Sequence, residues 1–394
     1  MNAQTRPGEA VAEDPDVGRQ LGELLQLIEG LIDLEHLRAV DARYLRALRW
    51  HETDRVPLLA RCPFGQRWQL PSPWDRFTTY PYRRAYHEPA MMMQNQLLDR
   101  VVPGLLLEDD NPLAIRADHG TIQVATALGG SWDALGDDYP WVQPFDSERQ
   151  VHELISGTRA IDLQTGVTAL STRTMQFYRT KLAQYPRASQ AIQISLPDLQ
   201  GPLDTAEQLW GSDVLLGLLE NPSQVGALLD RIVEGMLELA AHFRRHACDR
   251  LDPQANSQHG YIIPGRLMIR ADTAILVSPD TYREVVAPTD AELLRRIGTG
   301  AIHFCGNGQH LIEPMLEIPA LRGLDFGQSR MMDLGPIYEE CRRQRVAITN
   351  LQPERAELTS GEARRAYPTG VALVYPTTSI EDAREVVLSH RGRP

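Results

Sequence analysis

The chain has 394 residues, of which 42% are hydrophobic and 23% charged, an ordinary composition for a globular protein with one large barrel or two smaller domains. Its formal net charge of -12 argues against nucleic acid or an acidic membrane as the main partner, because both attract basic surfaces. The four cysteines are scattered without a CxxC motif, residues 1–18 lack an apolar core segment, and no apolar run is long enough to span a bilayer. We therefore expect a reduced, cytoplasmic protein.

The N-terminal part is predicted to differ from the rest of the chain. Residues 1–15 are rich in Glu, Asp, Pro, Gly and Ala, which predicts disorder. Within a helical extension over residues 16–52, apolar residues recur at helical spacing, so we expect one long helix or two helices broken near Asp33. Such an amphipathic stripe packs against the rest of the protein or against a second copy, and a homodimer would fit it. Residues 53–394 are expected to form a single barrel domain.

Short apolar strands and longer helical segments alternate along that domain. The predicted strands lie within residues 55–63, 101–108, 191–196, 259–272, 300–305, 323–328, 346–350 and 370–375, and residues 119–128 are predicted as a β-excursion. Between them, helices are predicted over residues 86–100, 145–185, 204–211, 222–248, 280–297, 309–316, 333–343 and 380–388. Asp204 or Thr205 is predicted to cap the third of these helices. Such alternation, without a GxGxxG loop, favours a (β/α)8 TIM barrel over a dinucleotide-binding fold.

Residues 300–308 are predicted to form a short buried strand that ends at a glycine. His303 and Cys305 then lie on one face of the strand, because side chains alternate with a period of two. Imidazole nitrogen and thiolate sulfur together suit a zinc-like ion. A plain packed pair is the alternative, since a free cysteine is often part of the core.

In a TIM barrel, the chemistry takes place at the C-terminal ends of the strands. Polar residues gather at these predicted ends: Arg61, Asp109, Asp198, Gln200, His259, Tyr261, Asp272, His303, Cys305, Asn307, Gln328, Asn350 and Tyr375. Each also has a structural interpretation; for example, Asp198 could cap a turn and Asp272 could pair with Arg270. The convergence of so many polar residues indicates a binding site more strongly than any one of them.

Several motifs, in this order and spacing, resemble the uroporphyrinogen decarboxylase (URO-D) superfamily. They are Asp198-Leu199-Gln200-Gly201-Pro202, Glu220-Asn221-Pro222, Asp272, Ser278-Pro279, Ala287-Pro288 and His303-Phe304-Cys305-Gly306-Asn307. The resemblance extends from about residue 55 to about residue 387 and implies a distorted (β/α)8 barrel with a deep cleft at the C-terminal ends of the strands. One branch of the superfamily decarboxylates the acetate side chains of uroporphyrinogen without a metal or cofactor. The other branch transfers methyl groups between a corrinoid and a thiol, using zinc held by a His-x-Cys pair and a later Cys.

The sequence departs from both branches. Where the decarboxylases have an arginine-rich segment of the type Arg-Gln-Ala-Gly-Arg-Tyr, only Arg61 and Arg67 match, which argues against a porphyrinogen substrate. The methyltransferase branch fits better through His303 and Cys305, but residues 374–379 contain no cysteine to serve as the third ligand. Cys341 is predicted to lie on a helix that points it away from the barrel mouth. A substitute such as Asp272 or His259 would then complete a three-ligand zinc site.

The leading prediction from the sequence is a methyltransferase or demethylase. Zinc (Zn) on His303 and Cys305 would activate a thiol or alcohol, and the methyl group would come from a corrinoid, on a partner protein, or from a methoxy compound. Catalytic roles are predicted for Asp198, Tyr261 and His303, and small-molecule substrate binding for Arg61, Gln200, His259, Asp272, Asn307, Gln328, Asn350 and Tyr375.

Two alternative functions remain open from the sequence. The first is a metal-free decarboxylase, in which Arg61 would hold a carboxylate and Asp198 or His303 would stabilise or deliver the proton. The second is a non-catalytic barrel that binds a small ligand or a corrinoid protein.

Overall fold

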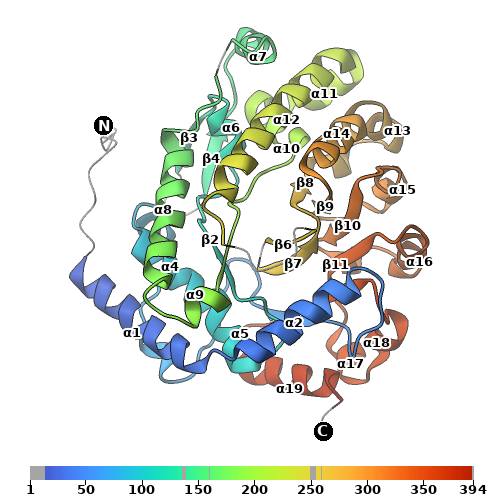
Figure 1. The fold of residues 1–394 in the computed structure, drawn as a ribbon. Coiled ribbons are helices and arrows are strands. Elements are labelled where there is room, and N and C mark those ends of the chain that lie inside the picture. The colour runs from blue at the N-terminus through green and yellow to red at the C-terminus, as the bar shows by residue number, and fades with distance from the viewer. Residues whose placement is uncertain (1–13, 135–138, 159, 249–253, 259, 393–394) are drawn as a thin grey trace.

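The computed structural model describes residues 14–134, 139–158, 160–248, 254–258 and 260–392 (Figure 1). The segment predicted to be disordered lies outside these residues except for its last two, and the predicted site residue His259 also lies outside them. Within the described part of the chain, no helix is long and apolar enough to cross a membrane.

Parallel strands lie inside a surrounding layer of helices (Figure 1). Six of them are hydrogen-bonded in the order β1-β12-β11-β10-β9-β8, and β2 and β5 form a separate parallel pair. Their bounds are β1 (Leu58–Arg61), β2 (Ala114–Arg116), β5 (Gln193–Ser195), β8 (Leu267–Arg270), β9 (Gly300–Phe304), β10 (Leu321–Phe326), β11 (Ala347–Leu351) and β12 (Val371–Pro376). The predicted α/β fold built on parallel strands is thus confirmed.

Strand β1 is not paired with β2, and two carboxylates from the segment before β2 bond its free edge instead. Asp110 Oδ2 accepts a hydrogen bond from the Leu58 backbone N–H at 2.9 Å, and Asp109 Oδ2 accepts one from Ala60 at 2.7 Å. Two acidic side chains therefore satisfy strand donors that a neighbouring strand would otherwise bond.

An antiparallel hairpin, β6 (Ala255–Gln258) and β7 (Tyr261–Pro264), lies in the middle of the molecule in Figure 1. Its side chains share a buried apolar cluster with four of the parallel strands: Leu59, Tyr261, Ile263, Met268, Ala301 and Val374. The Tyr261 hydroxyl donates a hydrogen bond to Asp325 near the end of β10, at 2.8 Å. The hairpin therefore fills the space between the strands, and Tyr261 lies toward their C-terminal ends. A second hairpin is formed by β3 (Ser131–Ala134) and β4 (Pro140–Gln143).

The predicted break in the N-terminal helix is present at Asp33. This residue caps the second helix, because its Oδ1 accepts hydrogen bonds from the backbone N–H groups of Glu35 and His36. The helices are α1 (Pro15–Leu31), α2 (Leu34–Ala47), α3 (Tyr82–Ala85), α4 (Pro89–Gln96), α5 (Val102–Leu107), α6 (Gln123–Ala127), α7 (Glu148–Ile155), α8 (Gly166–Leu182), α9 (Ala188–Ala191), α10 (Pro202–Trp210), α11 (Asp213–Glu220), α12 (Pro222–Arg244), α13 (Pro279–Thr281), α14 (Ala287–Ile297), α15 (Ile312–Leu316), α16 (Leu334–Gln344), α17 (Arg355–Thr359), α18 (Glu362–Ala366) and α19 (Ile380–His390).

Three local predictions between β1 and β5 are wrong. The continuous helix predicted over residues 145–185 consists of two separate helices, α7 and α8, and residues 160–165 between them are not helical. The apolar run 101–108 is not a strand: a π-helical turn, Leu97–Val101, continues into α5. The stretch 119–128 is not a β-excursion, because it contains α6. Apolar runs of this length fit a buried helix as well as a strand, and the strand in this region, β2, has only three residues.

Replacing the cap of the longest helix is expected to cost about 1 kcal/mol of unfolding free energy. The Asn221 side chain accepts a hydrogen bond from the Gln224 backbone N–H at the start of α12, as its sequence position before Pro222 predicts. Asn221→Ala removes this acceptor, whereas Asn221→Asp keeps one and serves as the control. Urea unfolding compares the three proteins, and an Asn221→Ala midpoint equal to that of the wild type would contradict the assignment of the cap.

Candidate metal centre

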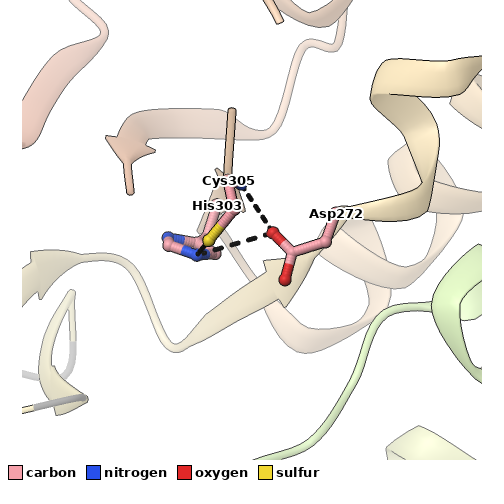
Figure 2. Close-up of side chains that lie close together, drawn as sticks. All are labelled: Asp272, His303 and Cys305. Carbon is pink, nitrogen blue, oxygen red and sulfur yellow. Dashed lines mark hydrogen bonds and ion pairs between the residues drawn. The ribbon is translucent and has the colours of Figure 1, made fainter. Parts of the chain in front are cut away.

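Three potential metal ligands meet at the C-terminal ends of β8 and β9. In Figure 2, Asp272 points toward His303 and Cys305. Asp272 Oδ1 accepts a hydrogen bond from the Cys305 backbone N–H at 2.6 Å and lies 3.7 Å from His303 Nε2, and Cys305 Sγ lies 3.5 Å from the same Nε2. The ligand atoms of all three lie within 4.8 Å of one another. One nitrogen, one sulfur and one oxygen atom could therefore coordinate the same ion at this site.

A buried carboxylate fixes the orientation of the histidine ring. Asp325 Oδ1 lies 2.5 Å from His303 Nδ1, and the hydroxyls of Tyr261 and Thr349 donate to the same carboxylate at 2.8 and 2.6 Å. Burial alone would raise the pKa of Asp325, but these hydrogen bonds, with that of His303 foremost, hold it below its usual range. An ionised Asp325 keeps the ring hydrogen on Nδ1. The lone pair of Nε2 then faces the other two potential metal ligands, Cys305 Sγ and Asp272 Oδ1.

A second buried carboxylate holds the loop that carries Asp272. Asp204 accepts hydrogen bonds from the backbone N–H groups of Asp272 and Thr273 at 3.0 and 2.8 Å. Burial, and then the charge of Asp272, raise the pKa of Asp204 to about 7. The prediction that Asp204 or Thr205 caps the helix is wrong, because α10 starts at Pro202 and Asp204 caps the loop after β8 instead.

The loop after β5, which carries Gly201, is in close backbone contact with the end of β8, two residues before Asp272. The Gly201 N–H donates to the Arg270 carbonyl at 3.0 Å, across the gap between β5 and β8. A Cβ atom on Gly201 would lie 2.0 Å from that carbonyl oxygen. The position of Asp272 therefore depends on a glycine in the neighbouring loop.

The donor set fits a catalytic zinc ion. Such sites have three protein ligands from histidine, cysteine and carboxylate side chains, with a carboxylate bonded to the far nitrogen of the histidine and a fourth position open to substrate. His303 is almost buried, with 8% of its side chain exposed, whereas the Asp272 side chain is 44% exposed. The cluster is accordingly accessible from the Asp272 side.

In metal-free protein, the Cys305 thiol is expected to alkylate slowly. Burial, and then the nearby Asp272 charge, raise its pKa to about 12. The thiolate is the reactive form, so the iodoacetamide rate after chelation should rise about tenfold per pH unit from pH 8 to pH 11. Peptide mass spectrometry measures it, with the exposed Cys248 as the internal control. Fast labelling of Cys305 at pH 8 would contradict this environment.

The predicted catalytic residue Asp198 lies in a buried chain of ion pairs. Its Oδ2 is 3.0 Å from an Arg116 guanidinium nitrogen, its Oδ1 is 3.5 Å from Arg270 Nε, and Arg116 also pairs with Asp118 at 2.9 Å. Burial opposes ionisation, but Arg270 and then Arg116 hold the pKa of Asp198 below its usual value. Asp198 is thus kept ionised, which suits a role in orienting neighbours better than proton donation.

Tyr261, which is also predicted to have a catalytic role, is fully buried. Burial, and then the Asp325 charge, raise the pKa of its hydroxyl well above the ordinary value. Because that hydroxyl donates to Asp325, Tyr261 positions the carboxylate behind His303. The Arg61 guanidinium carbon lies 5.5 Å from the centroid of its ring.

Most of the predicted substrate-binding residues make local hydrogen bonds around the strand ends, and Gln200 is buried there. Gln328 accepts from the Gly306 N–H, Asn307 from the Gln309 N–H and Asn350 from Gln352, while Tyr375 donates to Asp382. The structure brings together Asp272, His303 and Cys305 from the predicted set. Cys341 is fully buried in α16 and is not part of the cluster.

Sequence reasoning missed Asp325, which contacts His303 directly. The predicted strand contains Leu324-Asp325-Phe326, and all three residues are fully buried. A carboxylate inside such a strand is costly unless it is paired, and this is the signal that could have identified it.

No family model and no curated protein matches this sequence. The structure is similar to that of a methyltransferase from Methanosarcina mazei, with a TM-score of 0.64 and 17% sequence identity over 90% of this chain and 98% of the other. At this identity the similarity establishes a shared fold. The chain is therefore an α/β protein with the fold of that methyltransferase and with a three-donor cluster at its strand ends.

Proposed function

We propose that this chain is a zinc-dependent methyltransferase of the URO-D-like type, in which His303, Cys305 and Asp272 hold the ion. One observation carries the proposal: Asp325 fixes His303 so that Nε2 faces both a thiol and a carboxylate. The fold shared with a methyltransferase supports the same class of reaction. Asp272 takes the place of the later cysteine that the sequence lacks.

The residues around the proposed zinc site have different roles in the reaction. Bound zinc would supply a Lewis acid that lowers the pKa of a substrate thiol or alcohol. Asp325 holds the proton on His303 Nδ1, and Asp204 holds the Asp272 loop in place. In the reaction, the substrate sulfur or oxygen gains a carbon bond, the donor loses its methyl group without the bonding electron pair, and the thiol or alcohol proton passes to solvent. We propose a corrinoid, carried by a partner protein, as the methyl donor.

The alternative functions have weaker support. A decarboxylase would draw its proton from Asp198 or His303, yet ion pairs keep Asp198 ionised and His303 Nδ1 is bonded to Asp325. A barrel that only binds a ligand would have no use for a cluster of this composition. We also retain as proposals a single domain over residues 53–394 with a helical extension before it, a cytoplasmic location and a homodimer.

Demethylation of methylcobalamin tests the proposed reaction. Zinc-loaded protein, methylcobalamin and a thiol such as 2-mercaptoethanol are mixed, and the corrinoid spectrum and the methyl thioether are followed. We expect turnover by the wild type and by Cys248→Ser, and its loss after chelation or in Cys305→Ser. Turnover that survives both chelation and Cys305→Ser would contradict the proposal, as would carbon dioxide release from a carboxylic acid that requires no metal.

A further inference from the structure

The sulfur of Cys305 lies against the loop that follows β10. A Cβ atom on Gly327 would lie 2.7 Å from Cys305 Sγ and 3.1 Å from Cys305 Cα. The Gly327 backbone N–H also donates a hydrogen bond to the Phe304 carbonyl at 2.9 Å. Bare backbone therefore packs against the sulfur, at a distance that only a glycine permits.

The next residue, Gln328, reaches the same strand end with its side-chain amide. Its Oε1 accepts a hydrogen bond from the Gly306 backbone N–H. Since the amide oxygen is used in this way, Nε2 is the atom that faces the neighbouring thiol. Burial and then Asp272 raise the pKa of the Cys305 thiol, and a hydrogen bond from the Gln328 side chain opposes them. A bond that favours the thiolate is one in which the amide N–H donates to the sulfur.

The loop after β11 holds this segment in place. Gln352 Nε2 donates to the Gly327 carbonyl at 3.1 Å, and the Gln352 backbone N–H donates to Ser329 Oγ at 2.9 Å. The residues on both sides of Gln328 are thus fixed, whereas Gln328 itself is exposed. A replacement of its side chain should leave the fold intact.

A methyl-transfer site with a cysteine ligand has two possible methyl acceptors, the substrate and the ligand. A methyl group that passed to Cys305 would form a carbon–sulfur bond with a sulfur lone pair and leave the bonding electron pair with the donor. An anionic ligand would become a neutral thioether and would hold the metal poorly, because the thiolate is the metal-binding form. A hydrogen bond donated to a thiolate stabilises its lone pairs and makes them less reactive.

We propose that Gln328 is a positioning residue that acts through Cys305 and protects it from methylation. Its amide N–H bonds the sulfur while Gly327 packs against it, so the methyl group is directed to the substrate instead of the ligand. The inference rests on the proposed function, because it concerns Cys305 as a zinc ligand beside a methyl donor.

Reaction with iodomethane tests this protection without a corrinoid. Zinc-loaded protein is treated at neutral pH, iodide leaves with the bonding pair, and methylation of Cys305 is followed by peptide mass spectrometry with the exposed Cys248 as the internal standard. Gln328→Met removes both hydrogen bonds, whereas Gln328→Glu keeps an acceptor for the Gly306 N–H and lacks the donor. We expect Cys305 to react about tenfold faster in both variants than in the wild type, because a hydrogen bond to a charged group is lost.

Gln309→Met is the matched control. Gln309 also accepts a backbone N–H, from Asp333 at 2.9 Å, and its replacement should leave the rate at Cys305 unchanged. Acceleration in Gln328→Met alone would show that the glutamine merely holds Gly306, and acceleration in Gln328→Glu alone would show an effect of the added charge. Either result, or equal rates in all the proteins, would overturn the proposal.

Cobalt-loaded protein gives a second readout, which a merely structural role would not change. The charge-transfer absorption from thiolate to cobalt depends on the energy of the sulfur lone pairs, and hydrogen bonds to the sulfur tune it. We expect this band at longer wavelength in Gln328→Met and Gln328→Glu than in the wild type and Gln309→Met. An unchanged band in both Gln328 variants would contradict the bond to sulfur.

The outcomes separate this inference from the proposed function. Zinc uptake with equal methylation rates would overturn the protection and leave the proposed function standing. Faster methylation in both Gln328 variants, together with no turnover of methylcobalamin by the wild type, would support the protection and contradict the proposed reaction. A wild type that takes up neither zinc nor cobalt would overturn both.

Discussion

Replacing Asp325 with asparagine is expected to weaken zinc binding by about tenfold to hundredfold, the usual cost of losing a carboxylate behind a ligating histidine. Asp325 accepts from His303 Nδ1 at 2.5 Å and is fully buried. A neutral amide accepts more weakly, and its N–H can donate to Nδ1, which would move the ring hydrogen to Nε2. A protonated Nε2 has no lone pair for a metal.

Competition with a chromophoric zinc chelator measures this loss. Asp290→Asn is a matched control, because Asp290 is also buried and accepts a tyrosine hydroxyl, from Tyr282 at 2.8 Å, but lies away from the cluster. It should leave the zinc affinity unchanged. Wild-type affinity in Asp325→Asn would show that the histidine does not depend on this carboxylate and would remove the main support for the metal centre.

Substituting alanine for Gly201 is expected to lower the unfolding free energy by about 3 kcal/mol, from overpacking together with a lost hydrogen bond. The φ of Gly201 is -71°, so its backbone conformation would accept any residue and backbone strain adds nothing to this cost. The added Cβ would lie 2.0 Å from the Arg270 carbonyl oxygen and 2.7 Å from Ile269 Cγ2. The end of β8 must therefore shift, and Asp272 follows two residues later, so zinc binding should weaken as well.

Urea unfolding and zinc competition together check this prediction. Gly226→Ala provides the matched control, because its Cβ would meet nothing within 4 Å in the interior of α12. That change should stabilise the protein by up to about 1 kcal/mol through helix propensity. An unfolding midpoint for Gly201→Ala equal to that of the wild type would contradict the close contact between the loops after β5 and β8.

The periodic parts of the fold were predictable from the sequence. Strand–helix alternation after residue 260 matches the structure. Turn chemistry marks the helix starts, because the side chains of Asn221, Ser278 and Ser379 each accept a hydrogen bond from the backbone of the helix that follows. The region from residue 101 to 128 was not predictable, since buried helical turns there are as apolar as strands. The placement of the hairpin β6–β7 among the strands depends on tertiary packing, which no local pattern encodes.

Within the candidate site, only the potential metal ligands themselves were predictable from the sequence. The alternation within a strand places His303 and Cys305 on one face, and Asp272 was among the candidates for the third ligand. Asp325 was missed, because its contact with His303 joins two strands that are separated in the chain. It is a charged residue inside an apolar stretch, so the cost of burying a charge is the signal that points to it.

The metal content of protein purified without a chelator tests the central claim most directly. Mass spectrometry should find about one zinc per chain in the wild type and in the Cys248→Ser control, and much less in Cys305→Ser, because a catalytic site has three protein ligands and Cys305 is one of them. Zinc in Cys305→Ser at the wild-type level would contradict the assignment of the ligands. No metal in any of the three proteins, even after incubation with zinc, would contradict the metal centre itself.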